Sequence, residues 1–108
     1  MNDQLMAAER ALVAGLLDQA EHMYADVALR DPRNSIAIVG LARVAVERGD
    51  DLRALELGRR AMAIDPDNPA ASRLVDRIVE VMRFRGQDVP PPPPPEKRTF
   101  IDRLRRQP

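Results

Sequence analysis

The chain has 108 residues, with 17 basic and 17 acidic side chains, one histidine and no cysteine. The lack of cysteine excludes disulfides and thiolate metal sites, and a single histidine leaves no plausible ligand set for a transition metal. A net charge of zero argues against a general nucleic-acid-binding protein, although residues 1–89 are acidic and residues 90–108 are basic. Because only three residues are aromatic, we expect an aliphatic, alanine-rich core of closely packed helices.

Five helices are predicted in chain order. They cover about residues 3–14, 17–30, 35–48, 51–64 and 69–85. Gly15 and Gly49 stand where the first and third helices should end, because glycine accepts the left-handed conformation of a C-terminal turn. Gly86 is expected to end the fifth helix for the same reason. Asp50 or Asp51 can then cap the fourth helix.

The pattern D-P-x-N occurs at residues 31–34 and again at residues 65–68. Proline moves the aspartate before it out of the helical region, so each pattern should close a helix. Asn34 and Asn68 are good N-caps for the helices that follow, and Pro69 suits the first position of the fifth helix. D-P-x-N therefore marks the end of one helix pair and the start of the next.

An offset of 34 residues brings seven small or turn residues into register. They are Ala8/Ala42, Ala11/Ala45, Gly15/Gly49, Ala20/Ala54, Asp31/Asp65, Pro32/Pro66 and Asn34/Asn68. A 34-residue period of helix–turn–helix units is the signature of a tetratricopeptide repeat (TPR) array, and the chain resembles a TPR protein. The resemblance implies an all-α, right-handed solenoid of helical hairpins with five helices. The family's second-helix aromatic falls on Tyr24 in the first repeat but on Gly58 in the second.

The expected domain organisation has three parts. Residues 1–89 form the helical domain, with repeats at 1–34 and 35–68 and a capping helix at 69–85. Residues 90–95 are six prolines, which predict a stiff polyproline II linker, and formally they contain a PxxP ligand pattern. Residues 96–108 form a basic tail, expected to be flexible.

Three apolar residues of the tail would share a face of a short helix and form a candidate tail motif. They are Phe100, Ile101 and Leu104. This segment is a solvated tail, a short motif that docks on a partner, or a membrane-surface anchor, and the sequence leaves these alternatives open.

The resemblance implies a concave groove lined by the first helices of successive pairs, where the family commonly binds extended peptides or partner helices. Equivalent positions give two rows of candidate groove residues: Leu5, Val39 and Arg73 in one row, and Glu9, Arg43 and Arg77 in the next. The three arginines are expected to bind carboxylates in bidentate fashion. The alternative is that they are ordinary solvated helix arginines, some paired with neighbours such as Glu47 or Glu80.

Chaperone-binding TPR domains use a clamp of Lys, Asn and Arg at set groove positions. The corresponding residues here are Leu5, Glu9, Gly40, Ala70 and Leu74. None of them supplies the clamp, so that mode of binding is not expected.

No residue pattern predicts catalysis. His22 should face solvent, the acidic pairs fall in turns where capping explains them, and there is no glycine-rich phosphate loop. The chain starts without the apolar region of a signal peptide, and its longest apolar stretch is too short to span a bilayer. The preference for arginine over lysine indicates a bacterial source.

We therefore expect a cytoplasmic, non-enzymatic adaptor that binds an acidic or amphipathic protein segment in the groove. No cofactor, metal or nucleic acid is expected. The alternatives are a self-associating scaffold that forms homo-oligomers, and a membrane-peripheral accessory protein tethered by its basic tail.

Overall fold

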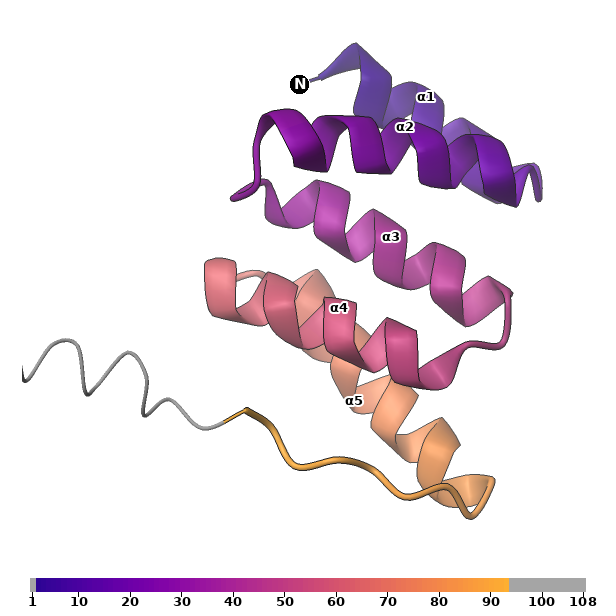
Figure 1. Cartoon of the computed structure of the whole chain (residues 1–108), viewed down its shortest axis with the longest axis vertical. Helices are drawn as coiled ribbons and strands as arrows, with labels where there is room; N and C mark the ends of the chain where they lie inside the picture. Colours follow the sequence, from indigo (N-terminus) through magenta and orange to yellow (C-terminus); the bar gives the residue numbers. More distant parts are fainter. Residues whose placement is uncertain (1, 94–108) are drawn as a thin grey trace, which may run out of the picture.

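The computed structural model describes residues 2–93, and all regular structure in this range is α-helical (Figure 1). The helices are α1 (Asp3–Val13), α2 (Leu17–Arg30), α3 (Ser35–Glu47), α4 (Asp51–Ile64) and α5 (Pro69–Phe84). All five predicted helices are confirmed, with boundaries that differ by at most one residue. Consecutive helices pack on each other, and α3 also contacts α1 and α5, as expected for stacked helical hairpins.

Glycines end three of the helices in the left-handed conformation. The φ angles are 80° at Gly15, 77° at Gly49 and 72° at Gly86. Because residues with a side chain rarely adopt these angles, the glycines fix where α1, α3 and α5 stop. The predicted helix ends are therefore confirmed at the level of the backbone.

The two D-P-x-N turns have nearly the same conformation. Asp31 has φ −136° and ψ 87°, and Asp65 has φ −137° and ψ 87°. The side-chain oxygen of Asn34 accepts a hydrogen bond from the Ala37 amide at 3.0 Å, and that of Asn68 accepts from the Ala70 amide at 3.0 Å. Each asparagine satisfies an amide that the helix itself leaves unpaired, which confirms both predicted caps.

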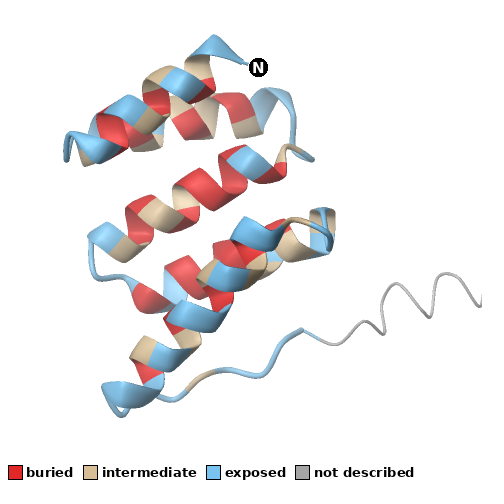
Figure 2. Cartoon of the chain, turned by 180° about the vertical axis from the view of Figure 1, so that it is seen from behind, coloured by how far each residue is buried: buried red, intermediate tan, exposed pale blue. Residues whose placement is uncertain are grey.

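The core consists mainly of aliphatic side chains, many of them alanine, together with Tyr24 and Met82, in three adjoining clusters between the helices (Figure 2). Of the alanines that recur at the 34-residue offset, Ala8, Ala20, Ala42 and Ala54 are fully buried, and Ala11 and Ala45 are buried with 6% and 7% exposure. Because alanine adds only one methyl group, these positions let neighbouring helix backbones approach closely. The alanine-rich core predicted from composition is confirmed.

Two sets of ion pairs connect the end of one helix to a neighbouring helix. Arg48, at the end of α3, binds both Asp18 and Glu21 of α2. Arg85, after α5, binds Asp51 at the start of α4 with an N–O distance of 2.7 Å. Asp51 is buried, whereas Asp18 is fully exposed, so the Arg85 pair is the better shielded of the two.

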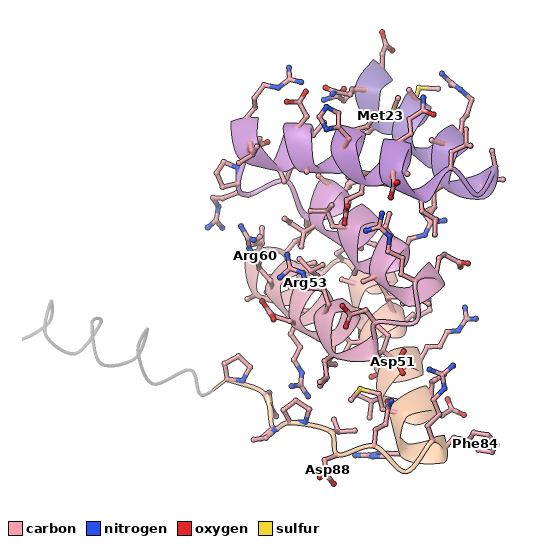
Figure 3. All side chains as sticks on the ribbon, turned by 45° about the vertical axis from the view of Figure 1, so that its right-hand side comes forward. Met23, Asp51, Arg53, Arg60, Phe84 and Asp88 are labelled. Carbon is pink, nitrogen blue, oxygen red and sulfur yellow. The ribbon has the colours of Figure 1, made fainter. Side chains whose placement is uncertain are left out.

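The segment after α5 turns back towards α4 (Figure 1). Val89 packs against the cluster between α4 and α5, and Arg59 of α4 donates a hydrogen bond to the Pro90 carbonyl at 2.7 Å. Phe84, at the end of α5, is 92% exposed and projects from the helix (Figure 3). Residues 94–108 lie outside the described residues, and with them the last two prolines of the 90–95 run and the candidate tail motif of Phe100, Ile101 and Leu104.

Candidate functional site

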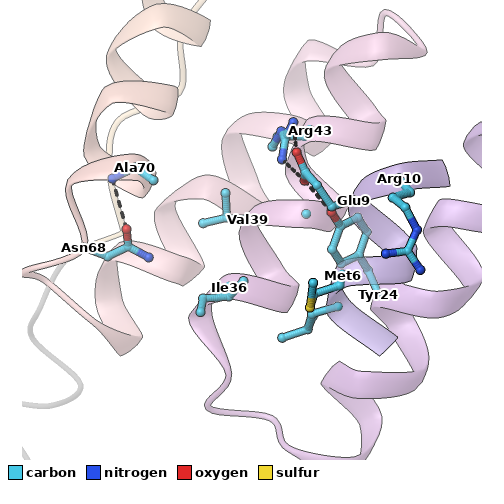
Figure 4. A pocket seen from close by; sticks show the side chains of 11 residues that line it. Met6, Glu9, Arg10, Tyr24, Ile36, Val39, Arg43, Asn68 and Ala70 are labelled. Atoms are coloured by element: carbon cyan, nitrogen blue, oxygen red, sulfur yellow. Dashed lines mark hydrogen bonds and ion pairs between the residues drawn. The ribbon is translucent and has the colours of Figure 1, made fainter. Parts of the chain in front are cut away.

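A hollow of about 480 Å³ opens beside α1 and α3 and reaches the start of α5 (Figure 4). Its lining is mostly apolar. The lining residues are Leu5, Met6, Glu9, Arg10, Tyr24, Ile36, Val39, Gly40, Arg43, Asn68 and Ala70. Four of the six predicted groove residues are among them, so the 34-residue offset does bring equivalent residues of α1 and α3 together.

The apolar part of the hollow has a buried floor and an exposed rim. Leu5 and Val39, the first predicted row, are buried with 8% and 9% exposure. Met6 and Ile36 stand beside them with 44% and 55% exposure. Large apolar side chains left this accessible around a concave surface are a common feature of binding sites.

Glu9 and Arg43 form an ion pair in the wall of the hollow. Arg43 donates two hydrogen bonds to the carboxylate, from Nη1 to Oε2 at 2.5 Å and from Nη2 to Oε1 at 3.2 Å. This bidentate pair joins α1 to α3 across one repeat. Arg43 therefore already holds a carboxylate of its own chain, and a partner carboxylate would have to compete with Glu9.

Tyr24 of α2 reaches the hollow between α1 and α3. Its ring packs directly against Gly40, where a Cβ atom would lie only 2.3 Å from the ring carbon Cε1. Its hydroxyl donates a hydrogen bond to Glu9 Oε2 at 3.0 Å. The missing side chain at residue 40 thus makes room for the ring, which in turn helps to orient the Glu9 carboxylate.

These contacts shift the pKa values of all three polar groups. Hydrogen bonds from Arg43 are the main reason that the pKa of Glu9 is lowered, and the same bonds raise the pKa of Arg43. Burial, followed by the hydrogen bond to Glu9, raises the pKa of Tyr24 to about 12. At neutral pH the site therefore contains a neutral tyrosine beside an ion pair with no net charge.

Arg73 and Arg77, the remaining predicted groove residues, are exposed on α5 and do not line this hollow. Arg77 instead lines a second hollow together with Arg43 and Glu47. Within residues 2–93 the structure gives neither arginine an ion-pair partner. Their predicted role in binding carboxylates stays a prediction.

The hollow is lined by apolar side chains together with Glu9, Arg10, Arg43, Asn68 and the Tyr24 hydroxyl. His22 is exposed on α2 and lies outside it. Among the described residues, no three His, Cys, Asp or Glu side chains gather in a way that could hold a metal ion. None of the helices in residues 2–93 is long and apolar enough to cross a membrane.

Sequence reasoning missed several residues of the site, including Met6, Tyr24, Ile36 and Asn68. Gly40 carried a usable signal, because a glycine inside a predicted helix often marks a close approach. Its partner was harder to find, since Tyr24 lies on the second helix of a pair and the candidate groove rows were drawn from first helices and α5.

Comparison with known proteins agrees with the fold. The tetratricopeptide repeat family model matches residues 11–78, which is more than half of the chain. The chain is 40% identical over 53 residues to cellulose synthase 1 operon protein C of Komagataeibacter xylinus, a match that covers 49% of this chain and 4% of that protein. No solved structure matches the chain significantly. The stacked helical hairpins and the family match together show that the chain belongs to the tetratricopeptide repeat family.

Proposed function

We propose that the protein is a non-enzymatic adaptor whose hollow on α1 and α3 binds the apolar face of an amphipathic segment from a partner protein. Tetratricopeptide repeats generally mediate protein–protein interactions, which supports a protein as the ligand. The observation that carries the proposal is the apolar lining of the hollow, with Met6 and Ile36 left exposed at its rim.

The charge arrangement supports an amphipathic partner more than a strongly acidic one. Glu9 neutralises Arg43 in the wall of the hollow, so a partner carboxylate gains little at that pair, and Arg10 is the remaining cation of the lining. Arg73 and Arg77 lie further along α5 and are exposed. A matching segment would place apolar side chains in the hollow and an acidic side chain towards α5.

The test is a peptide-library selection on the full chain, repeated with two single variants. Ile36→Asp places a charge at the rim of the hollow. Leu29→Asp changes another exposed apolar residue, on α2 and outside the hollow, and serves as the matched control. We expect amphipathic peptides that bind the wild type and Leu29→Asp equally but bind Ile36→Asp about tenfold more weakly or worse, because a charge would be desolvated at the rim.

Two results of this selection would overturn the proposal. One is a set of peptides that bind Ile36→Asp as tightly as wild type. The other is binding that Leu29→Asp weakens as much as Ile36→Asp does. A further pair of variants, Arg73→Glu and Arg77→Glu, separates the apolar contribution from the acidic one, since only acidic peptides should lose affinity to them.

A self-associating scaffold is the second candidate, supported by the exposure of Phe84 at the end of α5. An aromatic side chain with so little cover is a common feature of interfaces. Sedimentation equilibrium over a range of concentrations would test it. A mass that rises with concentration, and that returns to the monomer value in Phe84→Asp, would favour this scaffold over the adaptor.

A further inference from the structure

The chain after α5 begins as another hairpin would. In the turns after α1 and α3, the residue following the glycine donates its amide to a carbonyl five residues back, Leu16 to Ala11 and Asp50 to Ala45, each at 2.9 Å. The turn after α5 repeats this bond from Gln87 to Met82, also at 2.9 Å. A sixth helix would follow if the repeat continued.

Two features of the chain disfavour a sixth helix at this position. Prolines begin at residue 90, and proline lacks the amide that a helix interior needs. In addition, Asp76 occupies the position on α5 that is equivalent to Ala8 and Ala42, which are fully buried on α1 and α3. Because Asp76 is exposed and charged, α5 does not offer the close-packing surface on which a further helix would dock.

Residues Gln87–Pro93, which we call the strap, lie along α4 instead. Val89 is half-buried in the cluster between α4 and α5, and Arg59 holds the Pro90 carbonyl. A hollow of about 510 Å³ separates the strap from α4 and is lined by Leu52, Leu55, Glu56, Arg59, Arg60, Ala63, Pro90 and Pro93. The first prolines therefore do not leave the domain as a free spacer.

The strap has a defined orientation about its own axis. Residues that precede proline are extended, so a run of prolines adopts polyproline II, with three residues per turn. Pro90 and Pro93 are one turn apart and both face the hollow along α4. All four prolines are exposed, but only Pro90 and Pro93 line the hollow, so Pro91 and Pro92 fall on the two other edges of the polyproline II helix.

We propose that the strap is a second protein-binding surface, a clipped polyproline II ligand that presents Pro91 and Pro92 to a partner with an aromatic-lined proline groove. Such grooves bind proline-rich segments favourably because the polyproline II helix is formed before binding. Holding one edge on α4 lowers the entropy lost on binding still further. The strap hollow and the α1–α3 hollow share no residue, so this surface is additional to the proposed adaptor groove.

The charges on α4 refine the expected partner. Arg59 and Arg60 both line the strap hollow. Figure 3 shows Arg53 and Arg60 projecting from α4, and Asp88 on the strap. Glu56 is paired with Arg53, which leaves the surface beside the strap basic. The fitting groove therefore has carboxylates on the side that faces α4.

The experiment titrates the full chain into two isolated probes, an SH3 domain with an acidic rim and a WW domain. The chain contains no tryptophan, so the tryptophan fluorescence of each probe reports binding without interference. We expect a saturable change with at least one probe. Pro91→Ala with Pro92→Ala should weaken that binding about tenfold, whereas Pro90→Ala with Pro93→Ala, which removes as many prolines from the inner edge, should weaken it less than about threefold.

Three results would overturn the inference. The first is that neither probe binds the wild-type chain. The second is that both proline pairs weaken binding equally, and the third is that neither pair weakens it, which would place binding beyond the strap. The variant Ile36→Asp should bind the probes as the wild type does. The proposal for the α1–α3 hollow and the proposal for the strap can therefore fail independently of each other.

Discussion

A single methyl group added at Gly40 should destabilise the protein, although the same change stabilises most helices. Replacing glycine by alanine inside a solvent-exposed helix gains about 0.5–1 kcal/mol. At Gly40, however, the new Cβ atom would lie 2.3, 2.4 and 2.5 Å from three carbons of the Tyr24 ring. The ring is almost fully buried, so it can make room only by moving into the hollow that it lines or by a shift of α2 relative to α3.

The size of the effect follows from these contacts. Inserting an atom into a well-packed core costs about 1–3 kcal/mol, and moving the ring also breaks the hydrogen bond from Tyr24 to Glu9, which is worth about 1 kcal/mol. Subtracting the gain in helix propensity leaves a net loss of about 1–3 kcal/mol in the free energy of unfolding. For a domain of this size, each lost kcal/mol lowers Tm by about 4–8 °C.

Urea unfolding followed by circular dichroism would measure the loss for Gly40→Ala. The same change in a Tyr24→Ala background closes a double-mutant cycle, and there we expect Gly40→Ala to be neutral or stabilising. Gly58→Ala is the matched control, because a Cβ atom at residue 58 meets a single Val75 methyl group at 2.8 Å and should cost less. The reasoning is refuted if Gly40→Ala is as stable as the wild type, or if its cost is unchanged when the ring of Tyr24 is absent.

Three further predictions concern the polar groups of the hollow. Tyr24 is the only tyrosine, so absorbance at 295 nm should report its ionisation. We expect a midpoint near pH 12, against 10 for an unperturbed tyrosine. A midpoint near 10 in the folded protein would contradict the described burial of the ring. The pKa of Glu9 is lower in the folded than in the unfolded chain, so the charged carboxylate stabilises the fold. This contribution to the free energy of unfolding is complete above the unfolded pKa of about 4.5, and it is lost as the pH falls through the folded pKa. Unfolding free energies measured from pH 7 to pH 2 should therefore fall less steeply in Glu9→Gln than in the wild type, and equal slopes would count against the ion pair. Both partners are more than one-third exposed, so a double-mutant cycle with Arg43→Met should give a coupling below about 1 kcal/mol.

The helices and the repeat could be predicted because the signals that define them are local. Gly15 and Gly49 stop helices through their own φ angles, and Asn34 and Asn68 start helices by capping amides two or three residues away. Such effects act within one turn of chain and need no knowledge of distant neighbours. The 34-residue offset also placed Leu5 among the predicted groove residues, and Leu5 lies buried at the floor of the hollow.

The charges of the site depended on contacts between helices. An arginine on a helix surface can pair with several acidic residues, and the sequence suggested Glu47 or Glu80 as neighbours. The stacking of α1 on α3 instead brings Glu9 to Arg43, so a partner carboxylate would have to compete with Glu9 for this arginine.

By itself, then, the sequence determined the helices, their order and the repeat, because capping, glycine turns and proline are properties of a few adjacent residues. Only the tertiary structure decided that Tyr24 fills the space above Gly40 and that Glu9 forms an ion pair with Arg43. It also decided that the first prolines return along α4. Each of these contacts depends on how side chains from separate segments of the chain pack against one another. The free energy of that packing is set by distances of a few ångströms, which the spacing of residues along a chain does not specify.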